Sequence, residues 1–465
     1  MMSATLNATA LLGTFATTTS ASELSPDVAT KAAICLLDSL GLALAARHEP
    51  TAAAARAMAA EVLPGPRTAR IWASGKHAAL SEAVLANGIA VHAHFQDDTD
   101  HDSWTHPGSL IAPVAVSLGE TLDAPLRTVL TALTVGYSAL KWLGAGEVVA
   151  RGLIRRGVRT SPTFGTIGAA AAAAAALGLD PSRSTSAVAI AACTTGGTLE
   201  PVRCGSDEWR VQNGRAAQGG LVAAELAARG VQGAPDALEG PKGLLRSLAG
   251  LDRTPEQWQR GPDVATMIGI MAKPFATLGD NMSAVLAAHV LHRDGIDLPQ
   301  VKLITVTIWE PYTQYPGTSF KGPFTRTVQT QASTAFAVAA MLRYGRLDYE
   351  MGVEHRQDRE IMALVDKMIV EPDAIGTHLD ATVELEMENG ARLRRTAREA
   401  PKVLVFQDEA RATEVFESRL AGTGIPAGEG ASLAAEVFAS ARSGGSMPVR
   451  RLLDRLTRSQ RDAIR

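Results

Sequence analysis

Residues 161–178 read SPTFGTIGAAAAAAAALG, and this run sets the architecture of most of the chain. Ser161 and Pro162 supply a capping hydroxyl and a proline suited to a first helical turn, and Gly178 is suited to a helix end. The eight alanines between them favour a helix and allow close contact with neighbouring helices. We expect a core helix, because start and stop residues flank the alanines and argue against a low-complexity segment.

Other parts of the chain show the same helical pattern. Ser25-Pro26-Asp27 places a capping serine, a proline and an early acid before an apolar run that ends near Ala46. We expect helices from about Ser25 to Ala265 and again over residues 411–465.

The pattern changes after Lys273. Residues 301–308 (VKLITVTI) are rich in β-branched side chains, and residues 383–388 (VELEME) alternate apolar and acidic side chains. Asn389-Gly390 then predicts a tight hairpin. Residues 327–342 between the strands look helical, with Gly345 beyond the helix end.

These patterns predict a mainly α fold. A smaller α/β domain, residues 269–398, is inserted into a large all-helical domain, residues 1–268. The C-terminal helices, residues 399–465, return to the helical domain.

Composition excludes several classes of protein. The 465 residues include 45 Lys and Arg against 48 Asp and Glu, so no basic excess indicates a nucleic-acid partner. Cys35, Cys193 and Cys204 form no CxxC pattern, which argues against a disulfide framework and favours a reducing cytoplasm. Residues 1–25 contain no Lys or Arg, so we expect no secretory signal. We also expect no membrane span, because no run of 18 strongly apolar residues stands out.

Histidine and aspartate are concentrated in residues 87–107, NGIAVHAHFQDDTDHDSWTHP. Such a density suits proton transfer or metal ligation. The metal interpretation is the weaker one and we predict no metal, because no HExxH-type pair is present. A polar junction between helix and loop is the structural alternative. The residues concerned are His92, His94, His101, His106, Asp97, Asp98, Asp100 and Asp102.

Two further stretches carry positive charge. Arg203, Arg210 and Arg215 accompany several glycines in residues 200–220, which suits a carboxylate or phosphate, but no nucleotide-binding glycine motif is present. Lys273 lies at the predicted domain boundary, where pockets are common, and a solvated hinge lysine is the alternative.

The chain resembles the MmgE/PrpD family, which includes dehydratases, decarboxylases and epimerases of small carboxylic acids. The resemblance covers most of the chain and depends on the order and spacing of several motifs. These are Leu37-Asp38-Ser39-Leu40-Gly41, Asn87-Gly88, His92, Asp97-Asp98-Thr99, Thr105-His106-Pro107, the alanine helix of residues 165–180, Gly214-Arg215-Ala216-Ala217-Gln218, Lys273-Pro274-Phe275 and residues 333–345.

The resemblance implies a helical domain closed by an α/β lid, and a homodimer. It also implies an enzyme that acts without a cofactor on a small carboxylic acid.

Several positions depart from the family pattern. An aspartate, two histidines and a lysine of the family are replaced, and a further histidine becomes an amide. The departures fall at Phe95 (with Gln96 after it), Arg159, Trp209, Gln212 and Met282, whereas Asp97, Asp98, Thr99, His106 and Lys273 are retained. Because an apolar wall does not compensate a desolvated carboxylate, we expect a substrate less polar than methylcitrate that contacts Phe95, Trp209 and Met282, with Asp97, Arg159 and Gln212 as polar contacts.

The retained residues suit proton abstraction next to a carboxylate. We expect His106 to be the base and Lys273 or Arg159 to stabilise the resulting anion. Asp98 is expected to hold the imidazole, and Thr99 to bond a substrate oxygen. A leaving hydroxyl makes the reaction a dehydration, a lyase activity. Without one, the same first step gives epimerisation or isomerisation, and a catalytically degenerate member of the family is the remaining alternative.

Overall fold

A computed structural model describes residues 7–401 and 408–462. The chain divides into two compact units. The helical unit comprises Met1–Thr198, Arg210–Ala272 and Phe406–Arg465, and the α/β unit comprises Leu199–Trp209 and Lys273–Val405. Residues 199–209 therefore belong to the α/β unit, although their sequence pattern assigned them to the helical domain.

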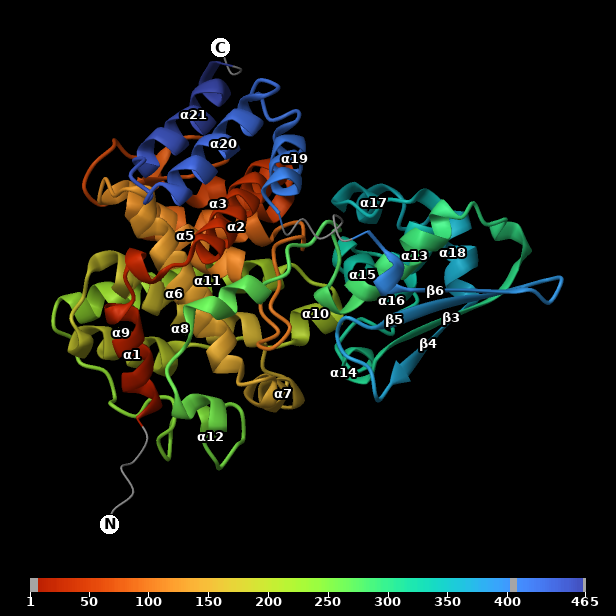
Figure 1. Ribbon diagram of the computed structural model, residues 1–465, viewed down its shortest axis with the longest axis horizontal. Coiled ribbons are helices and arrows are strands. Elements are labelled where there is room, and N and C mark those ends of the chain that lie inside the picture. Colours follow the sequence, from red (N-terminus) through yellow and green to blue (C-terminus); the bar gives the residue numbers. More distant parts are fainter. Residues whose placement is uncertain (1–6, 402–407, 463–465) are drawn as a thin grey trace. The chain divides into compact units, whose positions relative to one another are not determined.

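The helical unit is built from helices that surround an alanine-rich core (Figure 1). The predicted mainly α fold is confirmed, and the unit also contains a short antiparallel strand pair, β1 and β2, which the sequence patterns did not indicate. Its elements are α1 (Ala8–Thr18), α2 (Pro26–Ala45), α3 (Pro50–Met58), β1 (Thr68–Arg70), β2 (His77–Ala79), α4 (Leu80–His92), α5 (Pro107–Thr121), α6 (Leu126–Gly144), α7 (Val148–Arg155), α8 (Thr160–Leu177), α9 (Pro181–Thr194), α11 (Glu208–Ala228), α12 (Leu244–Ser247), α19 (Glu409–Leu420), α20 (Glu429–Arg442) and α21 (Val449–Asp462).

The predicted alanine helix is α8, and it lies in the core of the helical unit. Its alanines from 169 to 174 are fully buried, and it packs against α5, α6 and α9. The helix ends as predicted, with Gly178 in the left-handed region at φ +61°. The predicted start is wrong, because α8 begins at Thr160 and Arg159 is its N-cap residue. Ser161 and Pro162 lie in the first turn, where backbone N–H groups have no partner within the helix.

Helix α2 begins as predicted, with the Ser25 side chain accepting a hydrogen bond from the Val28 N–H at 3.3 Å. By length and composition, Pro26–His48 is apolar enough to cross a membrane, so the expectation of no such run is wrong. In the folded chain, 89% of its most apolar window is buried, which is also typical of a core helix.

Helices α4 and α11 touch backbone to backbone. A Cβ atom added at Gly214 would lie 2.6 Å from the Leu85 carbonyl oxygen, and one at Gly88 would lie 2.9 Å from the Gly214 Cα atom. The Asn87 side chain donates to the Arg70 carbonyl and accepts from the Trp72 N–H, both at 2.9 Å. These contacts fix the C-terminal end of α4, which carries His92.

The α/β unit contains a four-stranded sheet in the order β4-β3-β5-β6. Strand β3 is parallel to β4 and antiparallel to β5, and the predicted hairpin joins β5 to β6 through Gly390 at φ +83°. Helices α13 and α16 pack against the sheet (Figure 1). Its elements are α10 (Glu200–Cys204), α13 (Met282–Arg293), β3 (Val301–Trp309), α14 (Glu310–Thr313), α15 (Thr327–Ala332), α16 (Thr334–Tyr344), α17 (Tyr349–Glu354), α18 (Arg359–Asp366), β4 (Met368–Asp373), β5 (Ala381–Met387) and β6 (Arg392–Thr396).

The single helix predicted over residues 327–342 is wrong, because Ser333 divides it into α15 and α16. The Asn281 side chain donates to the carbonyl oxygens of Gln331 and Ala332, and the Thr277 hydroxyl donates to that of Gln331 at 2.7 Å. These bonds occupy carbonyl oxygens that would otherwise accept the next backbone hydrogen bonds of the helix. Ser333 then caps α16, and Gly345 ends it as predicted.

Candidate active site

His92, the last residue of α4, is fully buried between an acid and a guanidinium group. Its Nδ1 atom lies 2.8 and 3.0 Å from the two carboxylate oxygens of Asp97, and its Nε2 atom lies 2.8 Å from Nη2 of Arg159. Arginine is always charged and only donates, so Nε2 must accept this bond. It follows that His92 is neutral and carries its proton on Nδ1, from which it donates to Asp97.

Arg159 is held from both sides. Its Nη1 atom donates to Oε1 of Gln212 at 3.0 Å, and the Gln212 amide donates to the Thr198 carbonyl at the same distance. The backbone N–H of Arg159 donates to the Gly197 carbonyl at 2.8 Å. The predicted substrate-binding residues Arg159 and Gln212 thus lie in contact, although 53 residues separate them in sequence.

His106 lies directly before α5, with its Nδ1 atom 3.8 Å from Oδ1 of Asp97. This distance is too long for a hydrogen bond but short enough for electrostatic attraction. Asp97 therefore faces two imidazoles, those of His92 and His106, whose ring centroids are 5.0 Å apart. Phe95, at the left-handed φ of +56°, packs against both rings, at 5.4 Å from His92 and 5.2 Å from His106.

Asp98 does not hold an imidazole, so this interpretation of the sequence is wrong. One carboxylate oxygen accepts from the Gly108 N–H in the first turn of α5, and the other accepts from the Tyr137 hydroxyl at 2.7 Å. Burial, helped by the nearby Asp38 carboxylate, raises the pKa of Asp98 from 3.8 to about 7, although its two donors act in the opposite direction. Asp98 anchors the start of α5, and Asp97 takes the place beside the imidazoles.

Thr99 helps to shape the loop between α4 and α5. Its hydroxyl donates to the Thr105 carbonyl at 3.3 Å, and its backbone forms a bridge with Met271. Asp100 accepts from the backbone and hydroxyl of Ser103 and from Lys141 at 3.0 Å. Much of the acidic character of this loop therefore serves to hold its backbone.

The remaining predicted site residues belong to the α/β unit. Lys273 is fully buried and donates to the Thr277 carbonyl at 2.9 Å. Burial raises the pKa of Asp280 to about 7, whereas the positive charge of Lys273 acts to lower it. Trp209 is fully buried, and Met282, the first residue of α13, is 1% exposed. The grouping of these residues with His106 stays a prediction.

The arginines of residues 200–220 do not converge on one anion site. Arg203 is exposed and pairs with Glu200. Arg210 is buried, donates to the Ala93 carbonyl at 2.9 Å and lies 3.4 Å from the Glu49 carboxylate. Arg215 is exposed and bonds to Gln218. Arg203 is on α10 and the other two arginines are on α11, and their different partners argue against a shared ligand.

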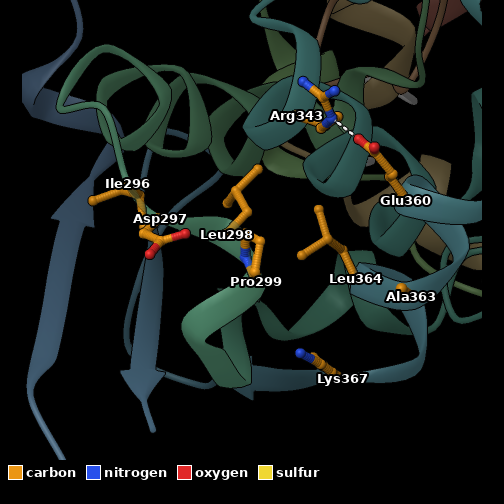
Figure 2. Close-up of a pocket in the computed structure, with 9 residues that line it drawn as sticks. All are labelled: Ile296, Asp297, Leu298, Pro299, Arg343, Glu360, Ala363, Leu364 and Lys367. Atoms are coloured by element: carbon orange, nitrogen blue, oxygen red, sulfur yellow. Dashed lines mark hydrogen bonds and ion pairs between the residues drawn. The ribbon is translucent and has the colours of Figure 1, made fainter. Parts of the chain in front are cut away.

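A surface pocket of about 420 Å³ lies in the α/β unit (Figure 2). Three of its four charged side chains have partners, since Arg343 pairs with Glu360 and Lys367 donates to the Val301 carbonyl at 2.5 Å. None of the predicted site residues lines it. Within residues 7–401 and 408–462, no group of three or more His, Cys, Asp or Glu side chains is arranged to hold a metal ion.

Two participants were missed by sequence reasoning. His92 was noted in the histidine-rich stretch and in the family resemblance but was given no role, although its position at a helix end five residues before Asp97 is a usable signal. Tyr137 lies 39 residues from Asp98, and no local pattern marks it.

Comparison with known proteins identifies the family of the chain. The model of the MmgE/PrpD N-terminal domain matches residues 10–257, which is more than half of the chain, so the chain belongs to the MmgE/PrpD family.

Among curated proteins, the chain is 29% identical to the cis-aconitate decarboxylase-like protein oryM of Aspergillus oryzae, over 78% of this chain and 79% of that protein. It is 32% identical to the cis-aconitate decarboxylase of Homo sapiens, over 34% of this chain and 33% of that enzyme. A similar match, 32% over 32% of this chain and 31% of the relative, links it to the cis-aconitate decarboxylase of Mus musculus. The chain is a lyase-like member of its family.

Proposed function

We propose that this protein is a lyase that needs no cofactor and transfers a proton to or from a carbon atom next to a carboxylate of a small acid. The observation that carries the proposal is the placement of His106 beside Asp97, at 3.8 Å, with His92 bonded to the same carboxylate. A carboxylate beside an imidazole orients the ring and stabilises its protonated form, as proton transfer requires.

In the proposed dehydration, His106 removes the proton from the carbon next to the carboxylate. The electron pair of the C–H bond moves onto the carboxylate as an enediolate and then forms the carbon–carbon double bond. The hydroxyl leaves as water, taking the proton that His106 removed, so the imidazole returns to its neutral form. Lys273 is proposed to stabilise the enediolate, because a fixed positive charge lowers the energy of a developing anion.

The names of the relatives favour a decarboxylation as the second candidate. There, the bond between carbon and a carboxyl group breaks and releases carbon dioxide. The electron pair left on the substrate is then protonated at carbon by His106, which acts as an acid in place of a base. Both reactions need the same imidazole and differ in which bond of the substrate breaks.

The substrate is proposed to be less polar than methylcitrate. Phe95 contacts both imidazoles where a more polar family site has an acid, and Trp209 and Met282 replace polar family residues. An apolar side chain leaves a desolvated carboxylate without a partner, which costs several kcal/mol in the worst case. Acids with fewer carboxylates should therefore be better substrates than tricarboxylates.

The experiment is incubation of the purified protein in deuterated water with cis-aconitate, citrate, methylcitrate and a series of less polar hydroxy and unsaturated acids. Proton NMR reports deuterium incorporation, and a coupled assay reports carbon dioxide. We expect turnover of at least one acid by the wild type and its loss in His106→Gln, with an unchanged melting curve. Turnover confined to tricarboxylates refutes the polarity argument, and full activity of His106→Gln refutes the role of His106.

A further inference from the structure

The contacts of Arg159 indicate that it positions a neighbouring side chain as well as supplying a positive charge. Its Nη2 atom donates to the only nitrogen of His92 that does not face Asp97, and its Nη1 atom is held by Gln212. We propose that Arg159 is a positioning residue, which locks His92 in the neutral form with the proton on Nδ1 and so keeps Asp97 available to His106. This inference rests on the proposed role of His106.

We call this hydrogen bond from Arg159 to Nε2 of His92 the lock. Without it, His92 would be able to take up a second proton. An imidazole beside a carboxylate gains a proton readily, since the opposite charge favours the charged form. A protonated His92 would form an ion pair with Asp97 at 2.8 Å and draw the carboxylate away from His106, which lies 3.8 Å from it. With a guanidinium N–H pointing at Nε2, that second proton has no place to bind.

The lock also explains why Arg159 is buried. The guanidinium is 2% exposed, and such burial of a charge is costly unless its donors are used. Two of its donors are used, one on Nε2 of His92 and one on Oε1 of Gln212. The charged or titratable groups of the surrounding elements of the helical unit include Lys31, Cys35 and Asp38 on α2, His94 and Asp98 in the loop after α4, Tyr137 on α6, Arg210 on α11 and Arg419 on α19.

The test is NMR of the histidine rings in full-length protein labelled at histidine, with the His92 signals assigned by their absence from His92→Asn. In the wild type we expect the shifts of the Nδ1–H form, unchanged between pH 5.5 and 8.5. In Arg159→Met we expect the His92 shifts to follow a titration curve through this range. Arg159→Lys keeps a charged donor and should restore the wild-type behaviour, and Arg156→Met, which removes an exposed charge nearby, should not alter it.

Two results overturn the inference. One is a wild-type His92 that titrates in this range or carries its proton on Nε2, a measurement that needs no variant to fold. The other is a His92 in folded Arg159→Met that does not titrate, which would assign the lock to burial alone.

An activity measurement then links the lock to the proposed reaction. With an acid that the wild type turns over, the acidic limb of log kcat/KM against pH should steepen from a slope of one towards two in Arg159→Met, because a second group now competes for Asp97. An unchanged slope overturns the link to His106. If no acid is turned over, the proposed function fails, while the ring shifts still decide whether Arg159 locks His92.

Discussion

Asparagine at position 98 should stabilise the protein at neutral pH. The Asp98 carboxyl is fully buried and accepts two hydrogen bonds, from the Gly108 N–H and the Tyr137 hydroxyl. The asparagine amide oxygen can accept from Gly108, and its NH₂ group can donate to the Tyr137 oxygen. Asp98→Asn therefore keeps the shape and both contacts, removes the ionisation and reverses the donor in the bond to Tyr137.

The size of the effect follows from the pKa of Asp98, which burial raises from 3.8 to about 7. Between these values the folded chain holds the proton and the unfolded chain does not, so the free energy of unfolding falls as the pH rises. The slope is about 1.4 kcal/mol per pH unit, and the loss reaches about 4 kcal/mol above pH 7. Well below pH 3.8 both states are protonated, and the loss vanishes.

Urea unfolding of the wild type and Asp98→Asn at pH 5, 6, 7 and 8 measures this difference. We expect the stability advantage of the variant to grow by roughly 2 kcal/mol from pH 5 to pH 7 and then to level off. Asp252→Asn is the matched control, since its side chain is 97% exposed and should leave the pH dependence unchanged. Parallel pH profiles of the wild type and Asp98→Asn would refute the reasoning.

Three further variants test other parts of the structure. Asp97→Asn should lower kcat/KM by about 10²- to 10⁴-fold without changing the melting curve, because the imidazoles lose their shared anion; near-wild-type turnover contradicts this. Gly214→Ala should cost about 1–3 kcal/mol in urea, since its Cβ would lie 2.6 Å from the Leu85 carbonyl, whereas Gly261→Ala, with open space around it, should cost less than 0.5 kcal/mol. Asn281→Ala should cost about 1–3 kcal/mol and speed hydrogen exchange in α16, because it leaves two carbonyls without this donor; unchanged exchange argues against the break at Ser333.

The parts of the fold that sequence predicts are those decided by near neighbours. Ser25 caps a helix whose first turn follows it directly, and Gly178 and Gly345 end helices because their own backbone can adopt a positive φ. The alternation in residues 383–388 places apolar side chains on one face of β5 whatever strand pairs with it. Each of these decisions needs only a few consecutive residues.

The errors come from partners that are distant in sequence. Residues 327–342 have a helical composition throughout, yet the side chains of Thr277 and Asn281, about 50 residues earlier, take carbonyls at the end of α15 and break the helix. The same is true of Arg159, whose partners are His92 and Gln212. A pattern within a short window cannot report a hydrogen bond whose other half lies elsewhere in the chain.

Asp97 and Asp98 show this limit at the smallest scale. They are adjacent and chemically identical, and both look like possible anchors for an imidazole. In an irregular loop, successive side chains diverge without a fixed period, and here one reaches the histidines while the other reaches Gly108 and Tyr137. The two residues should therefore differ by assay. Neutralising Asp97 should lower turnover, and neutralising Asp98 should flatten the pH dependence of unfolding whether or not turnover changes.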